Sequence, residues 1–144
     1  MIKLNYRTLN SEAFNLALQS LSSQSGFANF DTAYKIAKIV KQVADELKRA
    51  IENYQTLVRP YLVTDEAGNY KIAEKRHPSC PWEIKDGMTD EFNTMLTNFL
   101  NWEVTIYVEP IKTEGLGQIK LSPAHILALQ AIFDPSVFEV QESL

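Results

Sequence analysis

The chain has 144 residues, a formal net charge of −4 and a composition that is 45% hydrophobic and 22% charged. This length suits one domain, and the apolar content excludes an intrinsically disordered chain. The negative charge repels phosphate backbones and disfavours a nucleic-acid partner. We therefore expect a single globular domain over residues 1–133 and a C-terminal tail over residues 134–144.

Cysteine content and hydropathy indicate the compartment. The single cysteine, Cys80, excludes an internal disulfide, and the first residues lack the apolar run of a signal peptide. The longest uncharged stretch, residues 13–30, is interrupted by Asn, Gln, Ser and Gly. These features predict a chain of a reducing compartment with no membrane partner.

The N-terminal segment predicts a strand followed by a helix. Apolar and polar residues alternate over residues 2–6, which is typical of a half-buried strand. Asn10 or Ser11 can then cap a helix that ends in the "SSQSG" stretch. Its expected apolar face consists of Leu9, Ala13, Leu16, Ala17 and Leu21.

The segment "DTAYKIAKIVKQVADELKRAIENYQTLVRPYL", residues 31–62, predicts a long amphipathic helix that ends or kinks at Pro60. An apolar stripe with spacings of four and three runs through it: Ile36, Val40, Val43, Leu47, Ala50, Tyr54, Leu57 and Tyr61, widened by Ala37, Ala44, Ile51 and Val58. This stripe is broader than a coiled-coil seam. We expect it to serve mainly the core of its own domain, with an interface between chains as the alternative.

The next segment predicts a β-hairpin. Asp, Gly and Asn cluster between two short apolar runs, which predicts strands near residues 61–64 and 69–72, with Gly68 at positive φ. Residues 73–87, with two prolines and a glycine, indicate an irregular connection.

The C-terminal half predicts helix, strand and helix. Thr89 can cap a helix whose apolar face is Phe92, Met95, Leu96, Phe99 and Leu100. Residues 102–109 alternate as a strand, and Ser122 with Pro123 begins a helix that Asp134-Pro135 closes. The predicted fold is α+β and mostly helical, with a long central helix, three shorter helices and a small antiparallel sheet.

No motif predicts catalysis or a cofactor. His77 and Cys80 have a spacing that zinc sites use, but one cysteine and one other histidine, His125, leave the site short of ligands. No third group that would orient a Cys–His nucleophile is recognisable. We expect no catalytic, metal or cofactor-binding residue and no enzyme activity, and we interpret His77 and Cys80 as loop residues needed neither for folding nor for function.

Two further patterns are interpreted as structural and not as functional sites. The "GLGQIK" stretch, residues 115–120, lacks the spacing of a phosphate-binding loop. Basic residues from Lys35 to Arg49 are interleaved with acids and lack an aromatic platform on the polar side, as on a solvated helix face.

The C-terminal tail is the candidate interaction segment. Val137, Phe138, Val140 and Leu144 lie beside Glu139 and Glu142. Pro135 turns this segment away from the preceding helix. Two placements stay open: the tail packs on its own domain, or it docks on a neighbouring chain with Phe138 as anchor.

Three stretches carry a family resemblance: "AYKIAKIVKQVADELKRAIENYQTLVRPYLVTDEAGNYKI", "DEFNTMLTNFLNWEVTIYVEPI" and "KLSPAHILALQAIF". Together they resemble a family of small uncharacterised proteins of tailed bacteriophages, over roughly residues 30–133. The sequence departs from that family in the proline-rich "KRHPSCPWEIKDG" stretch and in the tail after Asp134.

The resemblance implies a phage origin and a non-enzymatic role, because such proteins usually lie near virion and tail-assembly genes. It transfers no functional residue. The expected function is a virion structural or assembly component that contacts phage structural proteins. The alternative is a small inhibitor or regulator that binds a host protein. Either role places the chain in the host cytoplasm, and both incorporation into the virion and homo-oligomerisation are left open.

Overall fold

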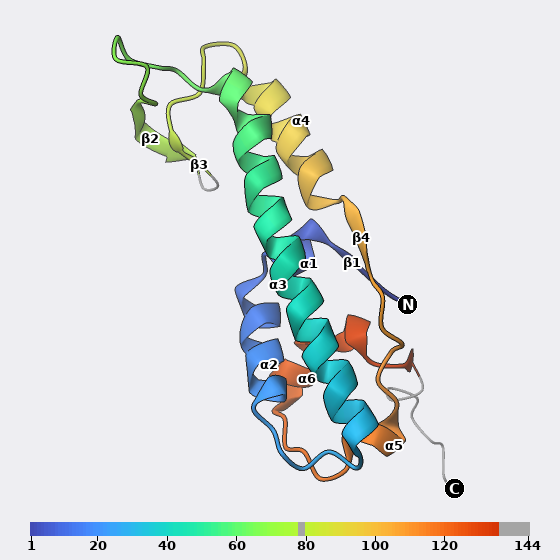
Figure 1. The fold of residues 1–144 in the computed structure, drawn as a ribbon. Helices are drawn as coiled ribbons and strands as arrows, with labels where there is room; N and C mark the ends of the chain where they lie inside the picture. Colours follow the sequence, from blue (N-terminus) through green and yellow to red (C-terminus); the bar gives the residue numbers. More distant parts are fainter. Residues whose placement is uncertain (78–79, 136–144) are drawn as a thin grey trace, which may run out of the picture. The chain divides into compact units, whose positions relative to one another are not determined.

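The computed structural model describes residues 1–77 and 80–135 (Figure 1). The chain divides into two compact units. Unit 1 holds Met1–Lys48 and the segment that begins at Glu103, and unit 2 holds Arg49–Trp102. One long helix contributes residues to both units. The predicted single domain over residues 1–133 stays a prediction. The predicted class, mostly helical α+β, is confirmed.

Unit 1 contains a two-stranded antiparallel sheet. Strand β1, Ile2–Asn5, pairs with β4, Glu103–Ile106, and Ile2 faces Ile106 across the ladder. The strand predicted over residues 102–109 is shorter, because beyond Ile106 the backbone N–H of Tyr107 donates to the Gln42 side chain at 2.7 Å. The apolar side chains on one face of this sheet are buried: Ile2, Leu4, Val104 and Ile106.

Two N-terminal helices follow β1. The Asn5 side chain accepts from the backbone N–H of Thr8 and begins α1, Tyr6–Leu9. Ser11 caps α2, Glu12–Ser22, as predicted. The predicted apolar face is wrong in part, because Ala13 and Leu16 are exposed and the bulkier pair Phe14 and Leu18 turns inward. The residues of α2 that are buried are Phe14, Ala17, Leu18 and Leu21.

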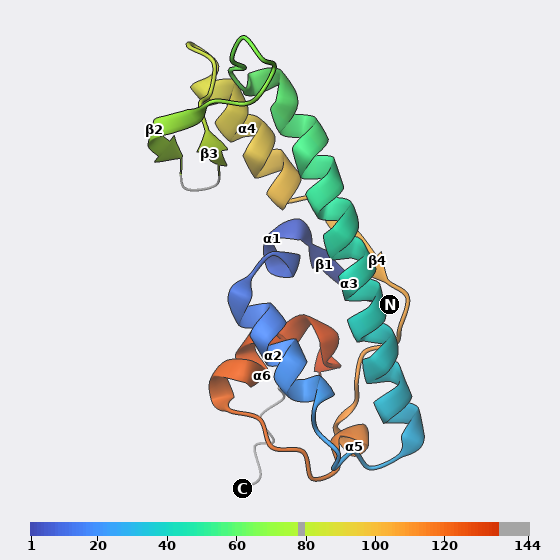
Figure 2. The ribbon, with the colours of Figure 1, turned by 60° about the vertical axis from the view of Figure 1, so that its left-hand side comes forward.

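The C-terminal helix packs against α2. Ser122 accepts from the backbone N–H of His125 and Pro123 follows it, which confirms the predicted start of α6, Pro123–Ala128. Figure 2 shows α6 beside α2. The helix is shorter than predicted, since the chain tightens into a 3₁₀ turn, Gln130–Ile132. A four-residue helix, α5, Thr113–Leu116, precedes it.

The long helix α3, Phe30–Val58, confirms the central prediction, and a 3₁₀ turn containing Pro60, Arg59–Tyr61, ends it. Its buried side is rotated relative to the predicted stripe. Ile39 is fully buried although it is outside that stripe, whereas Ile51 and Leu57 are 54% and 41% exposed. The buried residues of α3 are Thr32, Ile36, Ile39, Val43, Ala50 and Val58. The predicted widening through Ala37, Ala44 and Ile51 is therefore wrong, since these residues face solvent.

Unit 2 has its own small core. It consists of Val58, Leu62, Cys80 and Phe92. Helix α4, Thr89–Leu100, lies beside the last turns of α3 (Figure 2), where the rings of Phe99 and Tyr54 have centroids 5.8 Å apart. The predicted cap is wrong, because Met88 precedes the helix without a side-chain cap bond and Thr89 is its first residue.

The β structure of unit 2 lies partly where an irregular connection is predicted. Strand β2, Ile72–His77, pairs antiparallel with β3, Cys80–Trp82. The predicted hairpin pairing is present around a bridge between Thr64 and Tyr70, where Lys71 donates to Val63 at 3.0 Å and Asp65 donates to Asn69 at 2.8 Å. The 61–64 segment also bonds to the 83–85 segment, since Val63 donates to Glu83 and Lys85 donates to Tyr61. Gly68 at the turn has φ 83°, as predicted.

None of the described helices is long and apolar enough to cross a membrane.

Burial on α3 yields a matched test. Ile39→Ala should lower the free energy of unfolding by about 2–4 kcal/mol, because it leaves a cavity in a packed core. Ile51→Ala, the same change at an exposed position of the same helix, should alter it by less than about 0.5 kcal/mol. Denaturant unfolding followed by circular dichroism measures both. Equal losses would mean that Ile51 is covered and that the assigned orientation of α3 is wrong.

Candidate functional site

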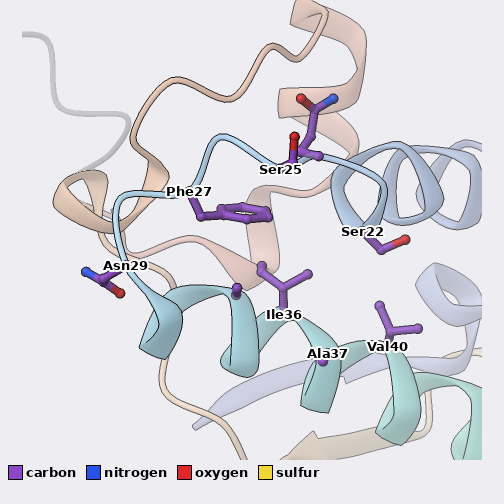
Figure 3. A pocket seen from close by; sticks show the side chains of 9 residues that line it. Ser22, Ser25, Phe27, Asn29, Ile36, Ala37 and Val40 are labelled. Carbon is purple, nitrogen blue, oxygen red and sulfur yellow. The ribbon is translucent and has the colours of Figure 1, made fainter.

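An open groove with a volume of about 440 Å³ lies in unit 1, between the start of α3 and the loop that joins α2 to α3 (Figure 3). Ile36 and Val40 point from α3 towards this loop; the ring of Phe27 stands over Ile36, and Val40 lies nearer to Ser22. The groove is therefore mainly apolar. Its lining residues are Ser22, Gln24, Ser25, Phe27, Asn29, Ala33, Ile36, Ala37 and Val40.

A second loop holds the wall of the groove in place. The Gln24 side chain donates to the backbone carbonyl of Lys120 at 3.0 Å and accepts from its N–H at 3.3 Å. The N–H of Gln118 donates to the carbonyl of Gly26 at 2.8 Å, and Ala28 donates to Gly115 at 3.1 Å. These bonds join residues 24–28 to residues 115–120, an arrangement that we call the loop clasp.

Glycines allow the two loops to approach so closely. Gly117 has φ 58°, and a Cβ atom there would collide with the backbone of residues 26–28. A Cβ atom on Gly115 would collide with the side chain of Thr32. The "GLGQIK" stretch, which lacks the spacing of a phosphate-binding loop, therefore has a packing role that follows from its glycines.

The start of α3 is fixed at the same place. Oδ1 of Asn29 accepts from both the backbone N–H and the hydroxyl of Thr32, each at 2.9 Å. Asn29 thus satisfies a helix N-terminal donor, and the buried Thr32 hydroxyl also has a partner. The groove is built against a helix end that these hydrogen bonds hold in place.

Beside the groove, the first turns of α3 expose an aromatic pair. Phe30 and Tyr34 are 83% and 51% exposed, and their rings are stacked with centroids 6.0 Å apart. Nζ of Lys38 lies 4.6 Å from the centroid of the Tyr34 ring. Lys35 pairs with Asp31 at 3.2 Å, one turn earlier. Large exposed aromatics next to an apolar groove are typical of protein-binding surfaces.

The groove and the aromatic pair were not predicted as a site. The sequence signal was present, because Phe30, Tyr34 and Lys38 recur at intervals of four and must lie on one face of a helix. The position of Phe27 and the exposure of Ala37 could not be predicted from the sequence, because both depend on the loop clasp.

The residues considered for chemistry lie elsewhere. The predicted interaction residues Val137, Phe138, Val140 and Leu144 lie outside the described residues. Among the residues whose side chains the structure describes, 1–73 and 80–135, no three His, Cys, Asp or Glu side chains gather as a metal site would require. His125 lies in α6 of unit 1, whereas Cys80 lies in unit 2.

The predicted loop position of Cys80 is wrong. This residue begins β3, is 2% exposed and belongs to the core of unit 2, so that its side chain contributes to packing. Burial and the neighbouring Cys80 thiol raise the pKa of the Tyr54 hydroxyl to about 12. Both effects favour the neutral phenol.

Comparison with protein-family models, with curated proteins and with solved structures finds no match to this chain.

The loop clasp should be sensitive to one methyl group. Gly117→Ala should lower the free energy of unfolding by about 2–4 kcal/mol, because it combines an unfavourable φ with a backbone collision. Gly68→Ala is the matched control, since Gly68 also has positive φ but nothing within 4 Å of its would-be Cβ atom. Gly68→Ala should lower the free energy of unfolding by only about 1 kcal/mol. If thermal or denaturant unfolding gives the two variants equal losses, the close approach of the loops is not present in solution.

The Tyr54 hydroxyl predicts an alkaline loss of stability. Its pKa is 10.0 ordinarily and about 12 in the folded chain, so the unfolded chain ionises first and stability decreases as pH rises from 10 towards 12. Below pH 10 this contribution is fully present. Tyr54→Phe should show a smaller loss over that range, whereas Tyr107→Phe, at a 70% exposed position, should behave as the parent chain. Urea unfolding at a series of pH values measures this, and identical pH profiles for all three chains would contradict it.

Proposed function

We propose that this chain is a non-enzymatic bacteriophage protein that acts by protein–protein contact, as a structural or assembly component of the virion. The proposal joins the family resemblance over residues 30–133 with one structural observation. That observation is the groove in unit 1 together with the exposed Phe30–Tyr34 pair beside it.

The physical support for this proposal is the unfavourable free energy of exposing apolar aromatic surface to water. A stacked pair in which Phe30 is 83% exposed leaves apolar area in water that burial against a partner would stabilise. Two aromatic rings at the edge of a groove with a fixed wall resemble the anchors that dominate binding energy at protein interfaces. The loop clasp and the Asn29 cap keep the surface organised before binding, which limits the entropy lost on association.

The charge around the groove also suits a protein partner. Lys38 and Lys41 are exposed on the same helix, while the chain as a whole carries a net charge of −4. A local positive surface on an acidic protein favours the approach of an acidic partner surface in one orientation.

The decisive experiment examines the particles. Mass spectrometry of purified virions and of assembly intermediates should detect this chain, and phage lacking its gene should produce incomplete particles. A chain that is absent from all particles and intermediates, but co-purifies with a host enzyme early in infection, would establish the alternative role of host-directed inhibitor and contradict the proposal.

A surface variant links this function to the groove. Phe30→Ala combined with Tyr34→Ala should reduce incorporation at least about tenfold, because hot-spot aromatics carry most of an interface's energy. Its unfolding free energy should change by less than about 0.5 kcal/mol. Tyr107→Ala, which removes a 70% exposed aromatic of the same unit, is the control and should be incorporated normally. Equal incorporation of all three chains would exclude the groove as the contact surface.

A further inference from the structure

The sequence contains a single aspartate that is followed by glycine, Asp86, and no asparagine is followed by glycine. The other aspartates precede a bulkier residue: threonine follows Asp31, glutamate follows Asp45, Asp65 and Asp90, and proline follows Asp134. The next residue matters because its backbone nitrogen can attack the carboxyl carbon of the aspartate side chain. Glycine hinders that attack least, since it has no Cβ atom.

Asp86 and Gly87 are the central residues of a β-turn in unit 2. The N–H of Met88 closes this turn by donating to the carbonyl of Lys85 at 3.1 Å. Gly87 has φ 78°, and a Cβ atom there would meet nothing within 4 Å. Both central residues are exposed. The turn is therefore surrounded by solvent on the side where its two central residues lie.

The two groups that would react are not held by other parts of the protein. Within the described part of the chain, neither the Asp86 carboxylate nor the Gly87 N–H has a hydrogen-bond or ion-pair partner. Turn types I and II differ by a rotation of the central peptide unit, and both keep the closing hydrogen bond. Gly87 accepts either sign of φ. Rotation of this unit brings the Gly87 nitrogen towards Cγ of Asp86.

Asp65 shows the contrasting arrangement in another exposed turn of the same unit. Its Oδ1 accepts from the N–H of Ala67 and from the N–H of Asn69, each at 2.9 Å. These bonds hold the carboxylate away from the nitrogen of the next residue, Glu66. Three further aspartates lie within helices, where the ordered backbone opposes the same rotation: Asp31 and Asp45 in α3, and Asp90 in α4.

We propose that Asp86 is a site of spontaneous isomerisation to isoaspartate in the folded chain. The Gly87 nitrogen attacks Cγ of the protonated Asp86 carboxyl. An N–Cγ bond forms, and the hydroxyl on Cγ leaves as water with the amide proton, which gives a cyclic succinimide. Water then adds to either carbonyl carbon of the ring. Addition at Cγ restores aspartate, whereas addition at the main-chain carbonyl leaves Gly87 bonded to Cγ, which is isoaspartate with unchanged mass.

The modification should affect the core of unit 2, because both ends of the turn are attached to it. The N–H of Lys85 donates to the carbonyl of Tyr61 at 2.7 Å. The carbonyl of Met88 accepts from the N–H of Phe92 at 2.9 Å, and Phe92 is fully buried. Isoaspartate adds a methylene group to the main chain between these two attachments. The closing bond of the turn then loses its geometry, and the start of α4 is destabilised.

The test follows the full chain during incubation at neutral pH and physiological temperature. A synthetic peptide of residues 81–92 serves as the reference for an unconstrained Asp–Gly sequence. Electron-transfer fragmentation of proteolytic peptides distinguishes isoaspartate from aspartate at each position. Isoaspartate should accumulate at position 86 of the folded chain at a rate within a few-fold of the peptide, because an exposed turn opens at little free-energy cost. Asp65 should stay aspartate over the same period.

Two variants separate this reaction from other changes on incubation. Asp86→Glu keeps the charge but requires a larger ring, so the signal at position 86 should be lost. Asp86→Asn should accumulate isoaspartate several-fold faster than the parent chain, because an uncharged amide is attacked more readily than a carboxylate. After incubation, thermal unfolding of the parent chain should show a loss of stability that Asp86→Glu does not show.

Three results would overturn the proposal. One is conversion of the peptide while position 86 of the folded chain stays aspartate, which would mean that the fold protects the turn. Another is equal accumulation at Asp65 and Asp86, which would mean that the hydrogen bonds of the Asp65 turn have no effect. The third is an equal loss of stability in the incubated parent chain and in incubated Asp86→Glu, which would contradict the attachment of the turn to the core.

Discussion

The loop clasp is the contact on which the candidate site depends. Residues 24–28 and 115–120 are far apart in the sequence and approach so closely that Gly117 cannot carry a side chain. The clasp presents Phe27 to α3, and next to it Asn29 caps that helix. Without this contact, nothing would hold the loop between α2 and α3 away from the helix, and the groove would not form.

The two apolar rows of α3 in unit 1 also differ in burial. In unit 1 the row that contains Ile36 and Ile39 is buried, while Ala37 and Ala44 in the neighbouring row are exposed. Because adjacent residues on a helix point about 100° apart, one packed layer covers one row well and leaves the next at its edge. An apolar stripe wider than one row can therefore be buried along one side and stay at the surface along the other.

Unit 2 depends on a different kind of constraint. Its core contains Cys80 and Phe92, and half-buried aromatic side chains surround it, including Tyr54 and Trp82. Aromatic rings bury much area per residue, so a short helix and small β bridges are enough to close a core of this size. The raised pKa of Tyr54 follows from this packing, since a phenolate beside a buried thiol would lose solvation without a compensating charge.

The sequence by itself determined the elements whose causes are local. Periodicity located α3, the pair Ser122 and Pro123 located the start of α6, and the turn chemistry around Gly68 located a positive φ, because each depends on residues within a few positions. Only the tertiary structure decided which row of α3 is buried and that Cys80 lies in a core. The contact of Gly117 with Gly26 was likewise decided by the tertiary structure. Each of these three features depends on a surface that a distant segment supplies. The sequence of a helix does not specify which neighbouring segment will cover it.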